Sequence, residues 1–416
     1  MKEVLYREFS DLIHRDNDRK TNESGKRTPL DVMIELTKLC SIKCTHCYIG
    51  DARWVKDPNE ISTQEVKDLL DLLHQKGTLW VCFTGGEALM RRDFREIWLY
   101  AKQKGFLLTL FTNATLIDES LGDFLVQYPP FNIEVSIYGA TEEAYERVSL
   151  VKGSFRRFLR GIEVLRSRPQ LKFLLKTVVM KENQMDLPLM KAMAEDLGVE
   201  FKFDPVINPS VGKGKSGGLA PCASRMSDDE VIEVELSDEK RRKDDSEWVE
   251  KAQAKPENAI RDDQLFGCSA GTNSLYLQAD GKMQMCVLTG HRGHSITKTP
   301  SMEQAFDKAW TSFGAAREEK LKENSPCKKC DIAYLCSNCP GFAYLETGSE
   351  HSAVEYLCQI THKKAQKLGI RHQCHPSHFH FEKSEEGNHE PKEKDLQKTG
   401  SEENSSRCGS SIGGGM

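Results

Sequence analysis

Short apolar runs alternate with amphipathic stretches between Asp31 and about residue 207. The runs that predict strands lie at about 31–36, 79–83, 106–111, 132–137, 171–180 and 199–206. The stretches with helical spacing lie at about 62–76, 93–104, 118–127, 154–166 and 186–197. Buried strands that alternate with helices indicate parallel βα units. A closed barrel of such units needs eight, so six of them predict an open, partial (βα)6 barrel of the α/β class.

The rest of the chain divides by composition. Residues 1–30 are polar and predict a flexible lead-in, and residues 31–207 form the predicted barrel core. Residues 208–266 are densely charged and predict a linker with one or two surface helices. A small cysteine-rich domain is expected at 267–376. The tail, 377–416, is almost without apolar residues, so it cannot offset its chain entropy and is expected to be disordered.

Charge and targeting signals narrow the class of protein. The net charge of −5 gives no broad basic field for nucleic acid. The N-terminus has no apolar signal region, and no run of about 18 apolar residues predicts a membrane helix. We therefore expect a cytoplasmic protein that binds neither nucleic acid nor membrane. In that compartment the fourteen cysteines, which are clustered, favour metal ligation over disulfides.

The first cysteine cluster directly follows the first predicted strand. Cys40, Cys44 and Cys47 have the spacing C-x3-C-x2-C. Cysteine thiolates hold iron–sulfur clusters, and a [4Fe–4S] cluster normally takes four of them. Three cysteines would leave one iron open to a small molecule. Half of a zinc site is the alternative, although zinc sites more often use paired C-x2-C ligands.

This spacing resembles the signature of the radical S-adenosylmethionine (SAM) enzymes. The resemblance implies that the amino and carboxylate groups of SAM chelate the open iron. An electron from the cluster would then cleave SAM to methionine and a 5′-deoxyadenosyl radical. Gly85-Gly86-Glu87 follows the second strand and resembles the GGE motif of the same family. By that match its backbone and Glu87 would hold the ammonium group of SAM.

The resemblance implies further contacts to SAM. Ser136 ends the fourth strand, where relatives often use a hydroxyl, and Arg147 lies where they often carry a basic residue near the SAM carboxylate. His46 occupies the position whose ring lies near adenine. Packing is the alternative for His46, and a surface ion pair is the alternative for Arg147. The predicted cofactor-binding residues are His46, Gly85, Gly86, Glu87, Ser136 and Arg147, and no catalytic residue is assigned.

A second set of seven cysteines lies near the C-terminal end. They are Cys268, Cys286, Cys327, Cys330, Cys336, Cys339 and Cys358. Their order resembles the SPASM extension of radical SAM enzymes, which holds auxiliary iron–sulfur clusters. Relatives usually have three residues where two separate Cys336 from Cys339 here. The hairpin turn between the first two cysteines is predicted at Asp280-Gly281, and a zinc ribbon is the alternative to the whole reading.

The family scheme implies how these ligands are shared between two auxiliary [4Fe–4S] clusters. One cluster would take Cys327, Cys330, Cys336 and Cys358. The other would take Cys268, Cys286 and Cys339, with an open iron for a thiolate or amine of the substrate. Cys374 could instead supply the fourth ligand of that second cluster.

Together the two signatures predict a radical SAM/SPASM enzyme that modifies a ribosomally made peptide or protein, for example by a thioether or carbon–carbon crosslink. A dehydrogenase of protein side chains, as in sulfatase maturases, is one alternative. An iron–sulfur carrier or a zinc-binding adaptor is another. The expected partners are the peptide or protein substrate, an electron donor such as flavodoxin or ferredoxin, and a separate peptide-delivery protein. Such a protein is expected because the first thirty residues are too few for a peptide-binding domain.

Overall fold

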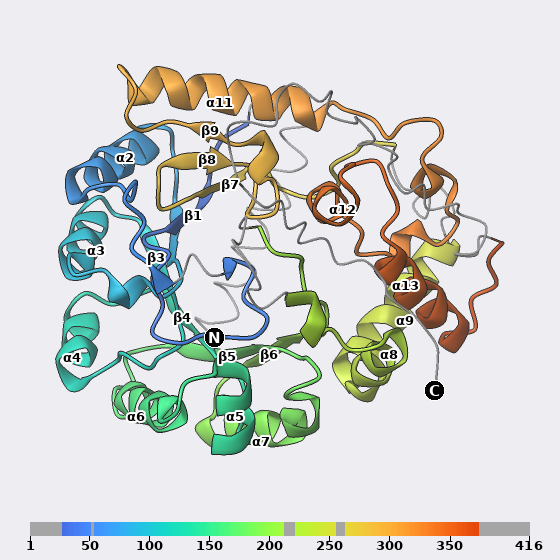
Figure 1. Cartoon of the computed structure of the whole chain (residues 1–416), viewed down its shortest axis with the longest axis horizontal. Coiled ribbons are helices and arrows are strands. Elements are labelled where there is room, and N and C mark those ends of the chain that lie inside the picture. The colour runs from blue at the N-terminus through green and yellow to red at the C-terminus, as the bar shows by residue number, and fades with distance from the viewer. Residues whose placement is uncertain (1–26, 51–53, 212–220, 255–262, 374–416) are drawn as a thin grey trace, which may run out of the picture.

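The computed structural model describes residues 27–50, 54–211, 221–254 and 263–373. Its centre is one nine-stranded sheet in the order β6-β5-β4-β3-β2-β1-β7-β8-β9 (Figure 1). The six strands of the barrel are β1 (Asp31–Glu35), β2 (Trp80–Thr84), β3 (Leu107–Thr112), β4 (Asn132–Ser136), β5 (Phe173–Val178) and β6 (Phe201–Asp204). Each pairs in parallel with the next one along the chain. The predicted partial barrel of α/β class is therefore confirmed.

Helices cover the outer face of these six strands, as Figure 1 shows. They are α2 (Thr63–Gln75), α3 (Phe94–Gln103), α4 (Glu119–Gln127), α5 (Glu142–Ser149), α6 (Ser154–Arg166) and α7 (Leu187–Leu197). The capping box of α2 joins Ser62 to Glu65, as their spacing predicts. Helix α5 is not predicted from the sequence, because its eight residues carry few apolar positions.

Strand alternation separates the packed core from the inside of the barrel. Val32 and Ile34 on β1 are completely buried against the helices, while Met33, between them, is partly exposed on the other face. On β5, Leu175 belongs to the same core, and its neighbour Lys176 faces inward. The apolar face thus fixes the register of the strands, and polar side chains remain for the interior.

Three further strands extend the sheet beyond the six predicted from the sequence. They are β7 (Ser274–Leu277), β8 (Lys282–Gln284) and β9 (His294–Ser295). Strand β7 pairs in parallel with β1, and β8 pairs antiparallel with β7. The predicted turn at Asp280-Gly281 joins β7 to β8. Gly281 has φ +79°, and a Cβ there would lie 1.9 Å from Thr297 Oγ1, so only glycine fits.

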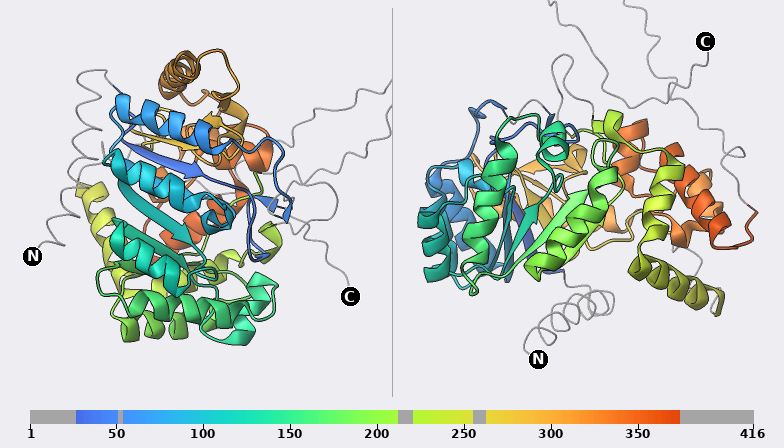
Figure 2. Two further views of the ribbon diagram at one scale, coloured as in Figure 1. Left: turned by 90° about the vertical axis from the view of Figure 1, so that its left-hand side faces the viewer. Right: turned by 90° about the horizontal axis from the view of Figure 1, so that it is seen from below.

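The remaining helices cover the hairpin and one side of the barrel. They are α8 (Asp228–Ser237), α9 (Glu239–Ala254), α11 (Met302–Arg317), α12 (Pro340–Thr347) and α13 (Glu355–Lys367). Helices α8 and α9 confirm the surface helices expected in the charged linker. Figure 2 shows that α8, α9, α12 and α13 gather on the side away from α2 and α3. The predicted disordered tail and most of the lead-in lie outside the described residues.

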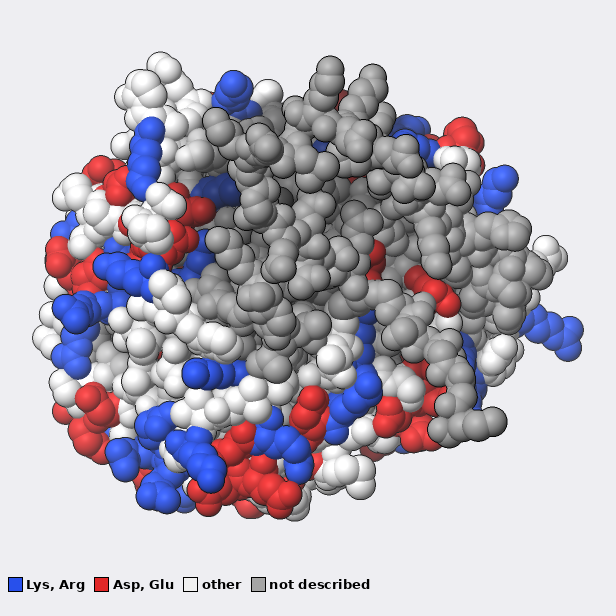
Figure 3. Space-filling model, in the orientation of Figure 1, with Lys and Arg blue, Asp and Glu red and all other residues white. Residues whose placement is uncertain are grey.

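The described surface carries charges of both signs. Figure 3 shows Lys and Arg side chains interleaved with Asp and Glu side chains on the face seen in Figure 1. None of the described helices is long and apolar enough to cross a membrane.

Candidate functional site

The three predicted cluster ligands lie on the loop that leaves β1, at the carboxyl ends of the barrel strands. Two backbone hydrogen bonds fix this loop to the end of α5: Lys43 N donates to Ser149 O at 2.8 Å, and Thr45 N to Val148 O at 3.0 Å. The side chain of Cys44 is buried in an apolar cluster with residues of the same loop, of α5 and of two other loops. The members of that cluster are Ile42, Cys44, Val148, Met180 and Ile207.

The two glycines of the GGE turn lie against the backbone of the same loop. Gly86 N donates to Thr37 O at 2.8 Å, and the next amide donates to Leu39 O at 2.7 Å. A Cβ at Gly86 would lie 2.3 Å from Leu39 O, and one at Gly85 would lie 2.4 Å from Thr37 O. These contacts exclude any side chain, so the glycines are needed to seat the cysteine loop on β2. Their predicted contact with SAM stays a prediction.

Glu87 is turned into the protein below that turn. Its carboxylate accepts from Thr112 Oγ1 at 2.9 Å and from Asn113 N at 2.8 Å, and only 1% of the residue is exposed. Burial raises the pKa of this carboxyl to about 7, against the effect of the hydrogen bonds. Asn113 Nδ2 in turn donates to Cys40 Sγ at 3.6 Å. Glu87 therefore orders the end of β3 beside the cysteine loop, and its role toward SAM stays a prediction.

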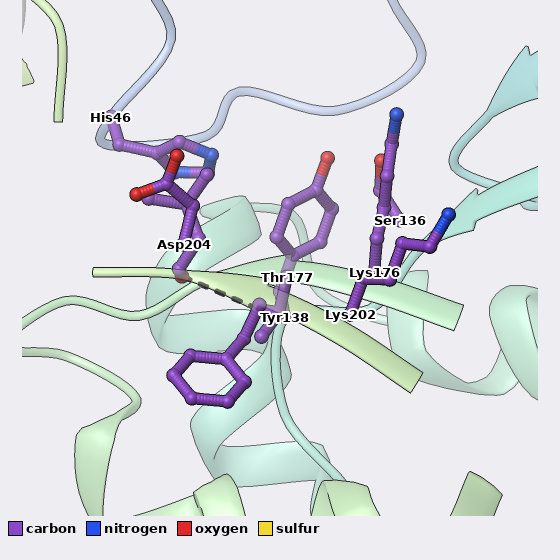
Figure 4. Close-up of a pocket in the computed structure, with 9 residues that line it drawn as sticks. His46, Ser136, Tyr138, Lys176, Thr177, Lys202 and Asp204 are labelled. Atoms are coloured by element: carbon purple, nitrogen blue, oxygen red, sulfur yellow. Dashed lines mark hydrogen bonds between the residues drawn. The ribbon is translucent and has the colours of Figure 1, made fainter. Parts of the chain in front are cut away.

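A cavity of about 290 Å³ opens inside the barrel next to the cysteine loop (Figure 4). It is lined by His46, Ser136, Tyr138, Lys176, Thr177, Val178, Lys202, Phe203 and Asp204. The centroids of the His46 and Tyr138 rings are 5.5 Å apart. Two of the predicted SAM-binding residues, His46 and Ser136, thus line the same cavity from different elements.

Charged side chains of both signs face this cavity. Lys176 lies between Ser136 and Lys202 in the register of β4, β5 and β6. Its ammonium group is 2.8 Å from Glu134 Oε2 and 3.2 Å from the centroid of the Phe111 ring. The surrounding barrel raises the pKa of Asp204 through desolvation. Such a lining suits a ligand with ionic groups of both signs, as SAM has.

Arg147 forms the surface ion pair that the sequence analysis gave as the alternative to a contact with SAM. It is half exposed on α5, and its Nη1 lies 3.2 Å from Glu143 Oε1. Its Nε donates to Glu182 O at 2.9 Å. The structure thus gives Arg147 a surface ion pair, and its contact with the SAM carboxylate stays a prediction.

In the second cysteine region, Cys286 lies next to two other predicted ligands. Burial raises the pKa of the Cys286 thiol to about 11, and the neighbouring thiols of Cys339 and Cys268 contribute to the rise. Asn338 connects a different pair, because its N donates to Cys336 Sγ at 3.4 Å and its Nδ2 to Cys327 Sγ at 3.5 Å. The predicted division of these ligands between two clusters stays a prediction.

The donor set on the first cysteine loop fits an iron–sulfur cluster. In the described parts of the chain, no three Cys, His, Asp or Glu side chains converge as they would on one metal ion. The thiolates of a [4Fe–4S] cluster bind separate irons at the corners of a cube, so they stand farther apart than the ligands of one ion. Three cysteines on one loop, in an apolar pocket with an amide donating to Cys40, suit such a cluster.

Several residues at the site were not found from the sequence. Tyr138 follows Ser136 at a spacing of two, and Lys202 and Asp204 alternate along β6, so strand parity could have indicated all three. Tyr145, which lies beneath the cysteine loop, carries no such signal because it sits on the unpredicted α5.

Comparison with known proteins gives a family and several relatives. Residues 34–191 match the family model described as the Radical SAM superfamily. The chain is 26% identical over 360 residues to an AdoMet-dependent heme synthase of Nitratidesulfovibrio vulgaris, covering 82% of this chain and 94% of that protein. It is 28% identical over 338 residues to the mycofactocin maturase MftC of Mycobacterium ulcerans, covering 77% and 84%.

The fold is also shared with a solved structure. Streptococcus suis SuiB bound to S-adenosylmethionine aligns with a TM-score of 0.58 and 15% identity, over 83% of this chain and 81% of that one. At this identity the likeness shows the fold alone. The cysteine loop, the glycine turn beneath it and the family match over the barrel agree, and residues 34–191 form a domain of the radical SAM superfamily of enzymes.

Proposed function

We propose that the chain cleaves SAM reductively at a cluster held by Cys40, Cys44 and Cys47, and uses the resulting radical to modify a ribosomally made peptide or protein. The observation that carries the proposal is the cavity inside the barrel, because His46 of the cysteine loop and Ser136 of β4 line it together. A ligand held there would lie beside the cluster. The bound cluster would supply the electron that splits SAM.

The protein's own residues would bind and shield. The two glycines and the backbone of the loop fix the position of the cysteines, and the apolar cluster around Cys44 excludes water. Ser136, Lys176 and Asp204 offer a hydroxyl, a cation and an anion to a bound ligand. A fixed polar lining of this kind orients the ligand without reorganisation during the reaction.

We place two auxiliary [4Fe–4S] clusters in the C-terminal region, on Cys327, Cys330, Cys336 and Cys358 and on Cys268, Cys286 and Cys339. Their role would be to bind the substrate or accept the electron released after hydrogen abstraction. An external donor such as flavodoxin or ferredoxin would reduce the first cluster, and a separate protein could deliver the peptide. The electrostatic effect of Cys339 and Cys268 on the pKa of the Cys286 thiol supports the second set of ligands.

The similarity to maturases supports a peptide or protein as substrate. MftC is named a maturase of mycofactocin, and SuiB has been crystallised with its precursor peptide SuiA. The cavity opens at the carboxyl ends of the strands, where a peptide side chain can enter from the mouth of the barrel.

A small anionic substrate is the second candidate. The match with the AdoMet-dependent heme synthase covers 94% of that protein, which supports a tetrapyrrole as the substrate. Lys176 and Lys202 lie opposite each other on neighbouring strands and both line the cavity. Like charges in this position repel. Glu134 already pairs with Lys176, and the carboxylates of a tetrapyrrole would add further anions beside the two lysines.

The test is anaerobic reconstitution with iron, sulfide, SAM and dithionite, followed by incubation with candidate precursor peptides or with iron porphyrins that bear carboxylates. We expect release of 5′-deoxyadenosine and the loss of two hydrogen atoms from a peptide, measured by mass spectrometry. A change of mass in the porphyrin but in no peptide would show that the substrate is the second candidate. An absence of 5′-deoxyadenosine in every reaction would contradict both.

A further inference from the structure

A buried hydroxyl group beneath the cysteine loop has no partner in the described parts of the chain. Tyr145, on α5, is fully buried, and its phenolic oxygen makes no hydrogen bond there. Leaving such a group unsatisfied costs about 1–3 kcal/mol. Native proteins rarely keep an unpaired buried hydroxyl, so the group needs an explanation in the assembled protein.

The ring of Tyr145 is held firmly, so its hydroxyl cannot turn to another partner. Its centroid lies 5.4 Å from that of Tyr138, 5.5 Å from that of Phe155 and 5.0 Å from that of Phe158. Gly139 also packs on the start of α5, where a Cβ would lie 2.6 Å from the Tyr145 backbone nitrogen. Both ends of the residue are therefore fixed by packing.

Burial is the main cause that raises the pKa of this phenol, and the neighbouring groups Cys44, Glu87 and Cys40 raise it further. Both carboxylate oxygens of Glu87 already accept hydrogen bonds from the end of β3. The hydrogen bonds from Lys43 and Thr45 to the last turn of α5 hold the cysteine loop over Tyr145. The unpartnered hydroxyl therefore lies beneath the loop that carries Cys40 and Cys44.

We propose that Tyr145 donates a hydrogen bond to a sulfur of the cluster held by Cys40, Cys44 and Cys47, and that this bond tunes the reduction potential of the cluster. This inference rests on the proposed function, which places the cluster on this loop. Two other donors already reach the cysteine sulfurs: Asn113 Nδ2 lies 3.6 Å from Cys40 Sγ, and the Tyr138 hydroxyl hydrogen-bonds Cys44. The apolar cluster around Cys44 strengthens each such bond, because water does not compete there.

The direction of the effect follows from charge. Reduction adds an electron to a cluster whose thiolates are already anionic, and a hydrogen-bond donor stabilises the more negative state. Hydrogen bonds to the sulfurs are one of the main determinants of cluster potential. Tyr145 therefore makes the cluster easier to reduce. It acts as a tuning residue, not as a group that touches the reacting atoms.

The test is a redox titration of Tyr145→Phe followed by electron paramagnetic resonance. A separate sample with SAM identifies the signal of the first cluster, because only that part of the reduced spectrum changes when SAM is added. The redox titration itself is run without SAM. We expect the ratio of reduced to oxidised cluster at fixed potential to fall about threefold, which corresponds to about 28 mV for one electron. Tyr356→Phe is the matched control, since it also removes a buried hydroxyl without a partner, in the C-terminal cluster of Phe342 and Leu357.

A second measurement keeps the inference testable if the midpoint is hard to resolve. The wild-type reduced cluster should show an exchangeable proton coupled to its spin in electron–nuclear double resonance, and Tyr145→Phe should lose it. Equal midpoints and an unchanged proton coupling in Tyr145→Phe would overturn the inference. A wild-type protein without any SAM-sensitive signal would instead count against the proposed function, so the two failures are distinct.

Discussion

Glu87 carries a carboxyl group that the fold buries almost completely. Its pKa is raised to about 7 because the ionised form loses its hydration. The raised value means that the folded chain holds this proton more tightly than the unfolded chain does. The contribution of this group to the free energy of unfolding is therefore complete below pH 4.5 and is lost as the pH rises through 7.

We expect the free energy of unfolding of the metal-free protein to fall between pH 5 and pH 8 by roughly 3 kcal/mol through this group, since each pKa unit is worth about 1.4 kcal/mol. Glu87→Gln cannot ionise, so its stability should change less over the same range. Urea denaturation at both pH values measures the difference. Parallel pH dependences in the two proteins would show that Glu87 does not titrate as described.

The individual side chains were predictable only where local sequence decides them. The Ser62–Glu65 capping box and the glycine at the Asp280-Gly281 turn were found because both depend on neighbours in the chain. The direction of Lys176 was not, because it depends on the register between strands. The ion pair of Lys176 with Glu134 appears only once β4 and β5 are side by side.

Two neighbouring elements, the cysteine loop and the glycine turn after β2, form one unit through their backbones. The contacts at Gly85 and Gly86 leave no room for a methyl group. A glycine that is usually explained by its approach to a ligand is here required already by the approach of another backbone segment. The positions of the three cysteines thus depend on the glycine turn as much as on the cysteine loop.

Gly86→Ala should displace the loop, because the added Cβ would lie 2.3 Å from Leu39 O. We expect the reconstituted protein to lose most of the iron of its first cluster and at least tenfold of its 5′-deoxyadenosine release. Gly105→Ala is the control: nothing lies within 4 Å of its Cβ, and its φ of +86° costs only about 1–2 kcal/mol. Iron analysis of both variants decides the point, and equal iron contents would refute the account of the turn.

At the level of elements, the sequence predicted the barrel well, but of the C-terminal strands only the turn that joins two of them. Continuous apolar runs and helical spacing define β1 to β6, and each runs next to its neighbour in the chain. The pairing of Asp31 with Ser274 joins segments more than two hundred residues apart. No local pattern carries such a pairing, so the hairpin could be predicted as a turn but not as part of the barrel sheet.

In the whole molecule this pairing ties the auxiliary cysteines to the barrel. Cys268 precedes β7 and Cys286 follows β8, while β7 itself pairs with β1, the strand before the first cysteine loop. The two cysteine regions therefore hold a fixed relation through one sheet. Such rigidity would keep the separation of the proposed clusters constant, as the proposed passage of an electron between them requires.

The central claim is that the loop of Cys40, Cys44 and Cys47 holds the cluster that splits SAM. Its most direct test compares Cys44→Ala with Cys82→Ala, which removes a buried thiol of β2 that belongs to no cysteine cluster. After anaerobic reconstitution with SAM and dithionite, 5′-deoxyadenosine is measured by chromatography. We expect Cys82→Ala to release it as the wild type does and Cys44→Ala to release none. Undiminished release from Cys44→Ala would contradict the account.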